Sequence, residues 1–99
     1  MSIHAVIFRI HEDSTYRERY ESVVQATRQQ TSSTYWDEPT SFILIESTKN
    51  SKDVATAIDA DSSFAHSKDL LLVINLSQKG YTALGNVTDN DLHALMSRR

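Results

Sequence analysis

The segment from Ile3 to Ile10 (IHAVIFRI) constrains the fold more than any other part of the sequence. In an extended strand, successive side chains point to opposite faces of the sheet. Both faces of this segment are mostly apolar, which predicts a central strand covered on at least one side. One face carries Ile3, Ala5, Ile7 and Arg9, and the other carries His4, Val6, Phe8 and Ile10.

The hydrophobic pattern then alternates between helical and extended periods. Residues 15–30 carry an apolar stripe at helical spacing, which predicts an amphipathic helix. Asp13 or Ser14 is the candidate N-cap of this helix. The aromatic pair 35–36 and the run 41–46 flank a polar turn and predict a hairpin. A second helix is expected from Asn50 or Ser51, with an end between 59 and 66. A fourth strand follows at 70–76, and Thr88 is expected to cap a short C-terminal helix, paired with Asp91.

This order predicts an α+β protein, a ferredoxin-like β-α-β-β-α-β sandwich with a short C-terminal strand or helix extension, in a single domain over residues 1–99. In such a sandwich the first strand lies between the third and fourth strands, and both helices cover one face. The residues expected to form one core are Val6, Phe8, Tyr20, Val24, Ile43, Ile45, Ile58, Leu71 and Val73.

Composition limits the classes of function. The chain has no cysteine, so it has neither a disulfide framework nor a thiolate metal site. The longest apolar run, 70–74, is too short to span a bilayer, and no secretory signal is visible at the N-terminus, so we expect a cytoplasmic protein with no membrane partner. The net charge of −3 argues against extensive binding of nucleic acid, although a basic face remains open.

Two stretches carry a resemblance to a known family. Residues 35–45 (YWDEPTSFILI) and 68–76 (KDLLLVINL), followed by Tyr81 between two glycines, resemble the small CRISPR-associated adaptation nucleases (Cas-two-like) and the related SinR-like proteins, over residues 3 to 85. The resemblance implies a ferredoxin-like homodimer and, in the nuclease members, a metal-binding aspartate at the end of the first strand of each subunit. Arg9 occupies that position in this chain.

A guanidinium group repels a divalent cation, which prefers carboxylate oxygens. We therefore expect a dimeric, non-catalytic binding or adaptor module for protein or nucleic acid, with no cofactor. One alternative is a metal-dependent endoribonuclease or endonuclease, in which His11, Glu12 and Asp13 hold Mg²⁺ or Mn²⁺ and Glu12 or Asp13 is catalytic. In the simpler interpretation, the two carboxylates favour the positive end of the first helix. A small regulatory or ligand-sensing module is a further alternative, by fold analogy alone.

Four residues are candidates for contacts with nucleic acid: Arg9, Arg17, Tyr35 and Trp36. Arginine matches the geometry of phosphate, and aromatic rings stack on bases. Arg19 and Arg28 lie on the same predicted helix as Arg17. The competing interpretations are an ordinary solvated face for the arginines and a core or interface role for the aromatic pair.

The predicted fourth strand has neither charge nor proline to protect an exposed edge, so another segment must cover it. Residues 81–84 are the available strand. In the resembling family the tail crosses to the partner subunit, whereas a hairpin back onto the same chain is the alternative. The candidate residues for the dimer interface are Leu70, Leu72, Ile74, Leu76, Tyr81 and Leu84.

Overall fold

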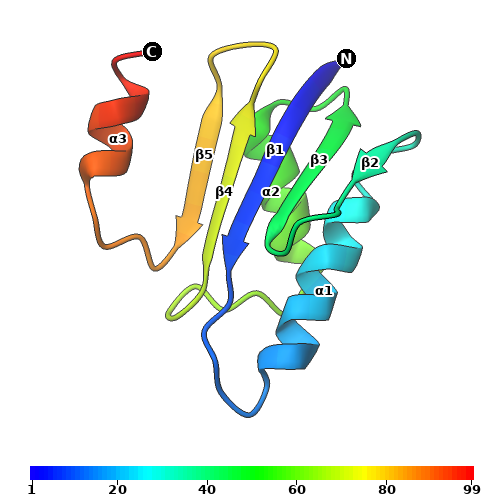
Figure 1. Cartoon of the computed structure of the whole chain (residues 1–99), viewed down its shortest axis with the longest axis vertical. Coiled ribbons are helices and arrows are strands. Elements are labelled where there is room, and N and C mark those ends of the chain that lie inside the picture. Colours follow the sequence, from blue (N-terminus) through cyan, green and yellow to red (C-terminus); the bar gives the residue numbers. More distant parts are fainter.

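The computed structural model of the chain describes residues 1–99, which form a five-stranded antiparallel sheet and three helices (Figure 1). The predicted α+β class is confirmed, and the arrangement is compatible with a ferredoxin-like fold. The elements are β1 (Ser2–Arg9), α1 (Tyr16–Arg28), β2 (Tyr35–Trp36), β3 (Phe42–Ser47), α2 (Ser51–Ala60), β4 (Leu70–Asn75), β5 (Tyr81–Gly85) and α3 (Asp91–Met96).

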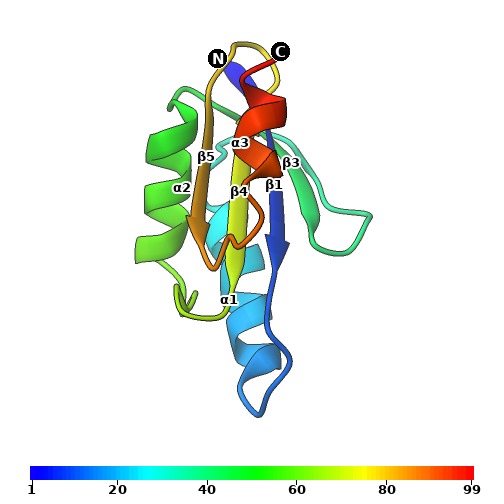
Figure 2. The same cartoon turned by 90° about the vertical axis from the view of Figure 1, so that its left-hand side faces the viewer.

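The strands lie in the order β2-β3-β1-β4-β5, so β1 is the middle strand of the sheet. It pairs with β3 on one side and with β4 on the other, and Val6 is opposite Ile43 and Val73. Helices α1 and α2 both lie against one face of the sheet, and the other face has no helix over it (Figure 2). No helix is both long enough and apolar enough to cross a membrane.

The core lies between the sheet and these two helices. Of the predicted core residues, Tyr20 and Val24 are half-buried and pack against its margin, and the others belong to the buried cluster. The sequence did not indicate Phe64, which is buried in the same cluster, because it lies in the loop after α2. The buried side chains of the cluster are Val6, Phe8, Ile10, Val23, Ala26, Ile43, Ile45, Val54, Ala55, Ile58, Phe64, Leu71 and Val73.

Strand β4 is not an edge strand, because β5 of the same chain pairs with it along its whole length. The tail thus forms the hairpin that was the alternative, and the expected crossing of residues 81–84 to a partner is wrong for this structure. Gly85 ends β5 with a φ of 89°, and a Cβ at this position would lie 2.2 Å from the carbonyl oxygen of Asp69. The close approach of β5 to β4 therefore requires glycine here.

The helix caps agree with the sequence only in part. Asn50 caps α2, because its side chain accepts a hydrogen bond of 2.8 Å from the backbone N–H of Asp53. The prediction that Thr88 caps the C-terminal helix is wrong. Helix α3 begins later, after Asn90, and its first residue, Asp91, donates its backbone N–H to the side chain of Asp89.

His4 lies on the helix-facing side of β1 and is fully buried, yet neither of its ring nitrogens has a hydrogen-bond partner. Burial disfavours the charged imidazolium and lowers the pKa of His4 below its ordinary value of 6.5. The unfolded chain therefore binds this proton at a higher pH than the folded chain does. The free energy of unfolding must then decrease as the pH falls below 6.5.

We predict that replacing His4→Leu removes this part of the pH dependence. Urea denaturation at pH 7.5, 6.0 and 5.0 measures it: the wild-type protein should lose stability over this range more steeply than the variant. At pH 7.5 the variant should be as stable as the wild type or slightly more stable, because an unpartnered polar ring is replaced by an apolar side chain. His11→Gln, at an exposed position, is the matched control. Equal pH slopes for wild type and His4→Leu would contradict the assignment.

Candidate functional site: the open face of the sheet

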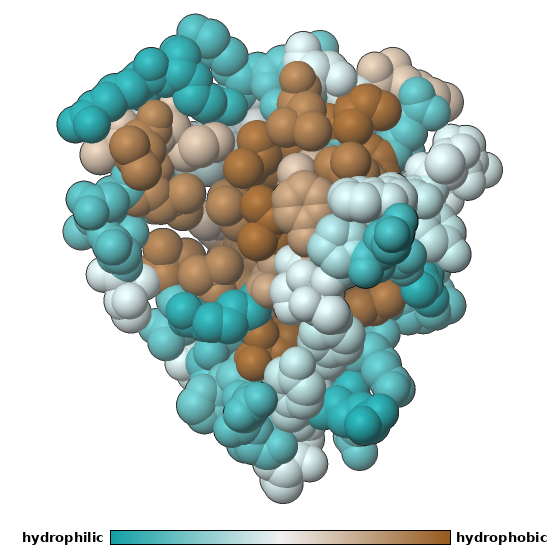
Figure 3. Space-filling model, in the orientation of Figure 1, coloured by the Kyte–Doolittle hydropathy of each residue, from teal (hydrophilic) through white to brown (hydrophobic).

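The face of the sheet opposite α1 and α2, here called the open face, is apolar and has no covering element. It appears as a continuous brown area over the centre of the molecule (Figure 3). The alternation of each strand, with the registers between strands, assigns its residues. They are Ile3, Ala5, Ile7 and Arg9 of β1, Trp36 of β2, Phe42, Leu44 and Glu46 of β3, Leu70, Leu72 and Ile74 of β4, and Tyr81 and Ala83 of β5.

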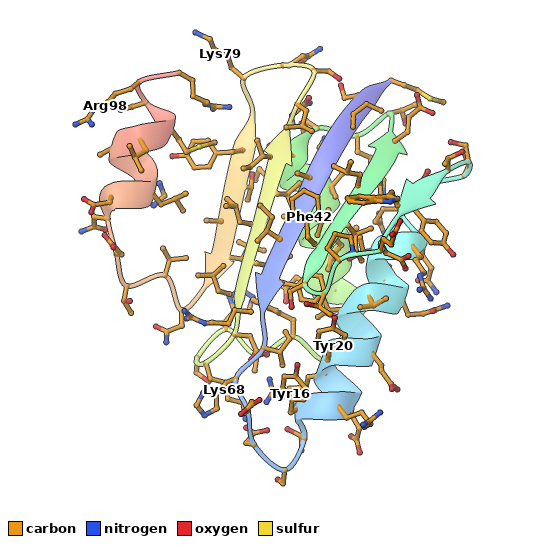
Figure 4. The ribbon with its side chains drawn as sticks, in the orientation of Figure 1. Tyr16, Tyr20, Phe42, Lys68, Lys79 and Arg98 are labelled. Atoms are coloured by element: carbon orange, nitrogen blue, oxygen red, sulfur yellow. The ribbon has the colours of Figure 1, made fainter.

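An aromatic pair lies on the β3 side of this face. Trp36 is 45% exposed, and its ring meets that of Phe42 edge to face, with the ring centroids 6.3 Å apart. Phe42 points toward the viewer, over the middle of the sheet (Figure 4). Large exposed aromatic and aliphatic side chains that form one patch are typical of surfaces that bind another macromolecule.

The charged residues of the open face lie at its two ends. Arg9 is the last residue of β1 and is opposite Leu70. Glu46 lies beside the start of β1, opposite Ile3. Neither side chain forms an ion pair within the chain. Glu46 accepts a hydrogen bond of 3.2 Å from the hydroxyl of Ser33. The centre of the face is therefore uncharged, with a cation at one end and an anion at the other.

A hollow of about 250 Å³ opens on this face next to Glu46. Its walls include Ile3, Leu44 and Trp36, and the carboxylate residue lies at its margin. An apolar wall with one carboxylate suits a long side chain that has an aliphatic stem and a cationic head. The sequence gave no signal for this hollow, because it is formed by three different strands.

Helix α3 lies beyond β5, at the border of the open face (Figures 1 and 2). His93 of α3 contacts Tyr81 of β5: the hydroxyl of Tyr81 is 2.8 Å from Nδ1 of His93, and the two ring centroids are 5.8 Å apart. After the helix, Arg99 donates to the carbonyl of Lys79 in the turn before β5. No residue of α3 is buried, and Leu95 is 60% exposed. The basic residues Lys79 and Arg98 are separate from each other at this end of the molecule, one in the turn between β4 and β5 and the other beyond α3 (Figure 4). Leu95 thus extends the exposed apolar surface.

The predicted interface residues fall into three groups. Leu70, Leu72, Ile74 and Tyr81 lie on the open face. Leu76 is 58% exposed in the turn after β4. Leu84 is opposite the buried Leu71 and packs against the core, so it does not belong to this surface. The sequence placed Leu84 wrongly because the register of β5 was unknown, and a shift of one residue exchanges the two faces of a strand.

The residues of the alternative metal site, His11, Glu12 and Asp13, do not form one cluster. Nowhere in residues 1–99 do three or more His, Asp or Glu side chains converge as metal ligands. The carboxylate of Asp13 is occupied by Lys68, at 2.5 Å, and by Arg19, at 2.7 Å. Hydrogen bonds from these two cations hold the pKa of Asp13 well below its ordinary value of 3.8. This carboxylate is therefore poorly suited to accept a proton or a metal ion.

Arg19 and Asp69 form a buried ion pair that sequence reasoning missed. The guanidinium Nη1 lies 2.5 and 2.6 Å from the two carboxylate oxygens of Asp69, whose side chain is completely buried. Arg19 also donates to the carbonyl of His11, to Asp13 and to the hydroxyl of Thr15. All five N–H groups of a guanidinium are thereby used. Arg19 is thus a structural residue. The sequence had left a contact with phosphate open for it, but its guanidinium group is fully used within the chain.

The ion pair ties the end of β1 to α1 and to the start of β4. Asp69 also accepts hydrogen bonds of 2.9 Å from the backbone N–H groups of His11 and Ala65. Burial alone raises the pKa of a carboxyl group, but the hydrogen bonds from Arg19 and from these backbone groups outweigh it, and the pKa of Asp69 is lowered. The stabilisation is present above the ordinary value of 3.8 and is lost as the pH falls below it.

The four candidates for nucleic-acid contact do not share one surface. Arg9 and Trp36 lie on the open face, Arg9 at the end of the middle strand β1 and Trp36 on the edge strand β2. Arg17 is exposed on α1 and pairs with Glu21 at 3.8 Å. Tyr35 lies on the other side of β2, and the guanidinium of Arg28 is 5.3 Å from the centre of its ring. The structure therefore does not assemble these residues into a basic, aromatic track of the kind that binds a nucleic-acid strand.

The comparisons with known proteins add no identification. No family model, no curated protein and no solved structure matches the chain.

We predict that Asp69→Asn lowers the free energy of unfolding by about 3 kcal/mol or more, because it leaves a buried guanidinium without its counter-charge. Urea denaturation at pH 7 measures the loss, which should shrink as the pH falls below 3.8. The double variant Arg19→Met with Asp69→Leu should be more stable than Asp69→Asn, because it removes both charges. Glu12→Gln, at an exposed neighbouring position, is the control. Equal stability of Asp69→Asn and Glu12→Gln would contradict the role of the pair.

Proposed function

We propose that the protein is a dimeric, non-catalytic binding module of ferredoxin-like fold, related to the adaptation-nuclease family that its sequence resembles. Two copies associate through their open faces, and the dimer acts as an adaptor for a further protein or nucleic acid. The apolar open face carries this proposal: it runs across the strands of the sheet, and no segment of the chain covers it. Contiguous exposed apolar patches of this kind commonly mark surfaces that bind a partner, which supports the proposal.

The size of the open face fits self-association. The two-residue β2 and four longer strands, spaced about 4.8 Å apart, give roughly 450 Å² per chain. Two faces together remove about 900 Å² of surface from water, close to the lower limit of about 1,000 Å² for a specific interface. The exposed side chain of Leu95 in α3, at the border of the face, adds to this area.

The end of β1 supports a non-catalytic role. Arg9 lies where the resembling nucleases have their metal-binding aspartate. The nearby carboxylates do not replace it, because Asp13 is held by Arg19 and Lys68, and Glu12 is exposed without two partner ligands. We therefore propose that the end of β1 has a structural and binding role in this protein. Metal-dependent cleavage is then a property of the nuclease members of the family only.

We predict a concentration-dependent monomer–dimer equilibrium that Leu72→Glu shifts to the monomer by at least tenfold in Kd. Leu72 lies on β4 near the centre of the open face, where a carboxylate would lose its hydration in the dimer. Sedimentation equilibrium at micromolar concentration measures the shift. Thr56→Glu, on an exposed position of α2 away from this face, should leave the equilibrium unchanged. A wild-type protein that stays monomeric up to about 1 mM would overturn the proposal.

We also predict that the purified protein does not cleave RNA or DNA in the presence of Mg²⁺ or Mn²⁺. The physical reason is the guanidinium of Arg9 where a carboxylate would be needed, together with the occupied carboxylate of Asp13. Gel analysis of labelled single- and double-stranded substrates is the measurement, with chelator added to a parallel sample. Cleavage that chelator abolishes and that Glu12→Ala also removes would establish the nuclease alternative instead.

A further inference from the structure

We infer that the two copies pack face to face about a two-fold axis that runs across the strands, so that Arg9 of each chain enters the hollow beside Glu46 of the other. This inference rests on the proposed function, since it specifies the partner and the orientation at the same surface. It follows from three features of the open face: the positions of its charges, its hollow and its distribution of large and small side chains.

The charges distinguish between the two ways in which identical sheets can stack symmetrically. Residues 3 and 9 are about 20 Å apart along β1, so Arg9 and Glu46 lie at opposite ends of the open face. An axis parallel to the strands superposes like ends and, where it runs above the middle strand β1, brings Arg9 close to its own copy, which is unfavourable. An axis across the strands superposes unlike ends, so each Arg9 meets a Glu46 and two ion pairs form by symmetry.

The hollow provides a place for the arginine. In the orientation across the strands, Arg9 of one chain lies above Ile3 of the other, where the hollow of about 250 Å³ opens. Ile3 and Leu44 can contact the methylene groups, and the ring of Trp36 offers a surface on which a guanidinium stacks. Glu46, which has no ion pair within its own chain, supplies the counter-charge.

The middle of β1 fits the same orientation. Ala5 and Ile7 are successive open-face residues on either side of the centre of the strand. An axis across the strands at this level places Ile7 of one chain over Ala5 of the other, so that a large side chain meets a small one. An axis along the strands would place Ile7 over Ile7 and Ala5 over Ala5, giving a clash beside a void. Interdigitation of large and small side chains favours the first arrangement.

Charge reversal tests the pairing. Arg9→Glu and Glu46→Arg should each weaken the dimer at least tenfold in Kd by sedimentation equilibrium, because each places two pairs of like charges in contact. The double variant Arg9→Glu with Glu46→Arg should return to within about threefold of the wild type. Lys52→Glu, at an exposed position of α2, makes the same change in net charge as Arg9→Glu and is its control. Single variants without effect, or a double variant no better than the singles, would overturn the inference.

Disulfide trapping tests the orientation without relying on energies, because the chain has no cysteine of its own. When Arg9→Cys protein is mixed with Glu46→Cys protein and oxidised, a disulfide-linked heterodimer should form, and neither protein alone should cross-link. Cross-linking of Arg9→Cys alone would show the axis along the strands and overturn the inference, while leaving the proposed dimer intact. A wild-type protein that is monomeric would instead overturn the proposed function, so the two failures are distinguishable.

Discussion

The sheet is apolar on both faces, and α1 and α2 cover only one of them. This imbalance is the constraint on which the account depends. The covered face forms the core, with residues such as Val6 and Val73 entirely removed from water. The open face keeps Ile3, Ile7 and Trp36 in contact with water. An antiparallel sheet with one solvated side normally carries polar residues on that side. The residues of this chain do not follow that pattern, and this departure is the basis of the proposed dimer.

The ends of the sheet are fixed by a different interaction. The buried pair of Arg19 and Asp69 joins α1 to the start of β4, and Asp13 and Lys68 extend it to the surface. A buried ion pair adds little to the free energy of unfolding compared with an apolar pair of the same shape. It does, however, fix the relative positions of the segments that carry it, because every hydrogen-bond donor must have an acceptor. It holds the end of β1, and therefore positions Arg9 at the margin of the open face. The ion pair that stabilises the fold therefore also positions a residue of the proposed dimer interface.

The sequence predicted most elements because the apolar period changes clearly along the chain. It indicated both faces of β1, the core residues of β3 and β4, and the cap of α2. It did not settle whether residues 81–84 stay with their own chain, because pairing between chains and within a chain uses the same backbone bonds. The register that turns Leu84 inward was also unknown.

The ion pair was missed although one signal for it was present. Arg19 falls within the apolar stripe of α1, beside Tyr16, Tyr20 and Val23 at helical spacing, and a charge on such a stripe needs a buried partner. Asp69 precedes the apolar run of β4 directly, but the contact spans 50 residues of sequence. Pairings at that separation follow only from the fold. The same holds for Arg9 and Glu46, whose opposite positions on the open face depend on the strand order.

Small-angle X-ray scattering of the wild-type protein tests the central claim most directly, because it reports mass and shape together. A single chain has a mass of 11.2 kDa, and its Cα radius of gyration is 12.8 Å. Packed sheets lie about 10 Å apart, so a face-to-face dimer should give twice the mass of the chain with a compact particle. A particle with the mass of one chain and a radius of gyration close to that of the monomer, at concentrations up to about 1 mM, would contradict the account.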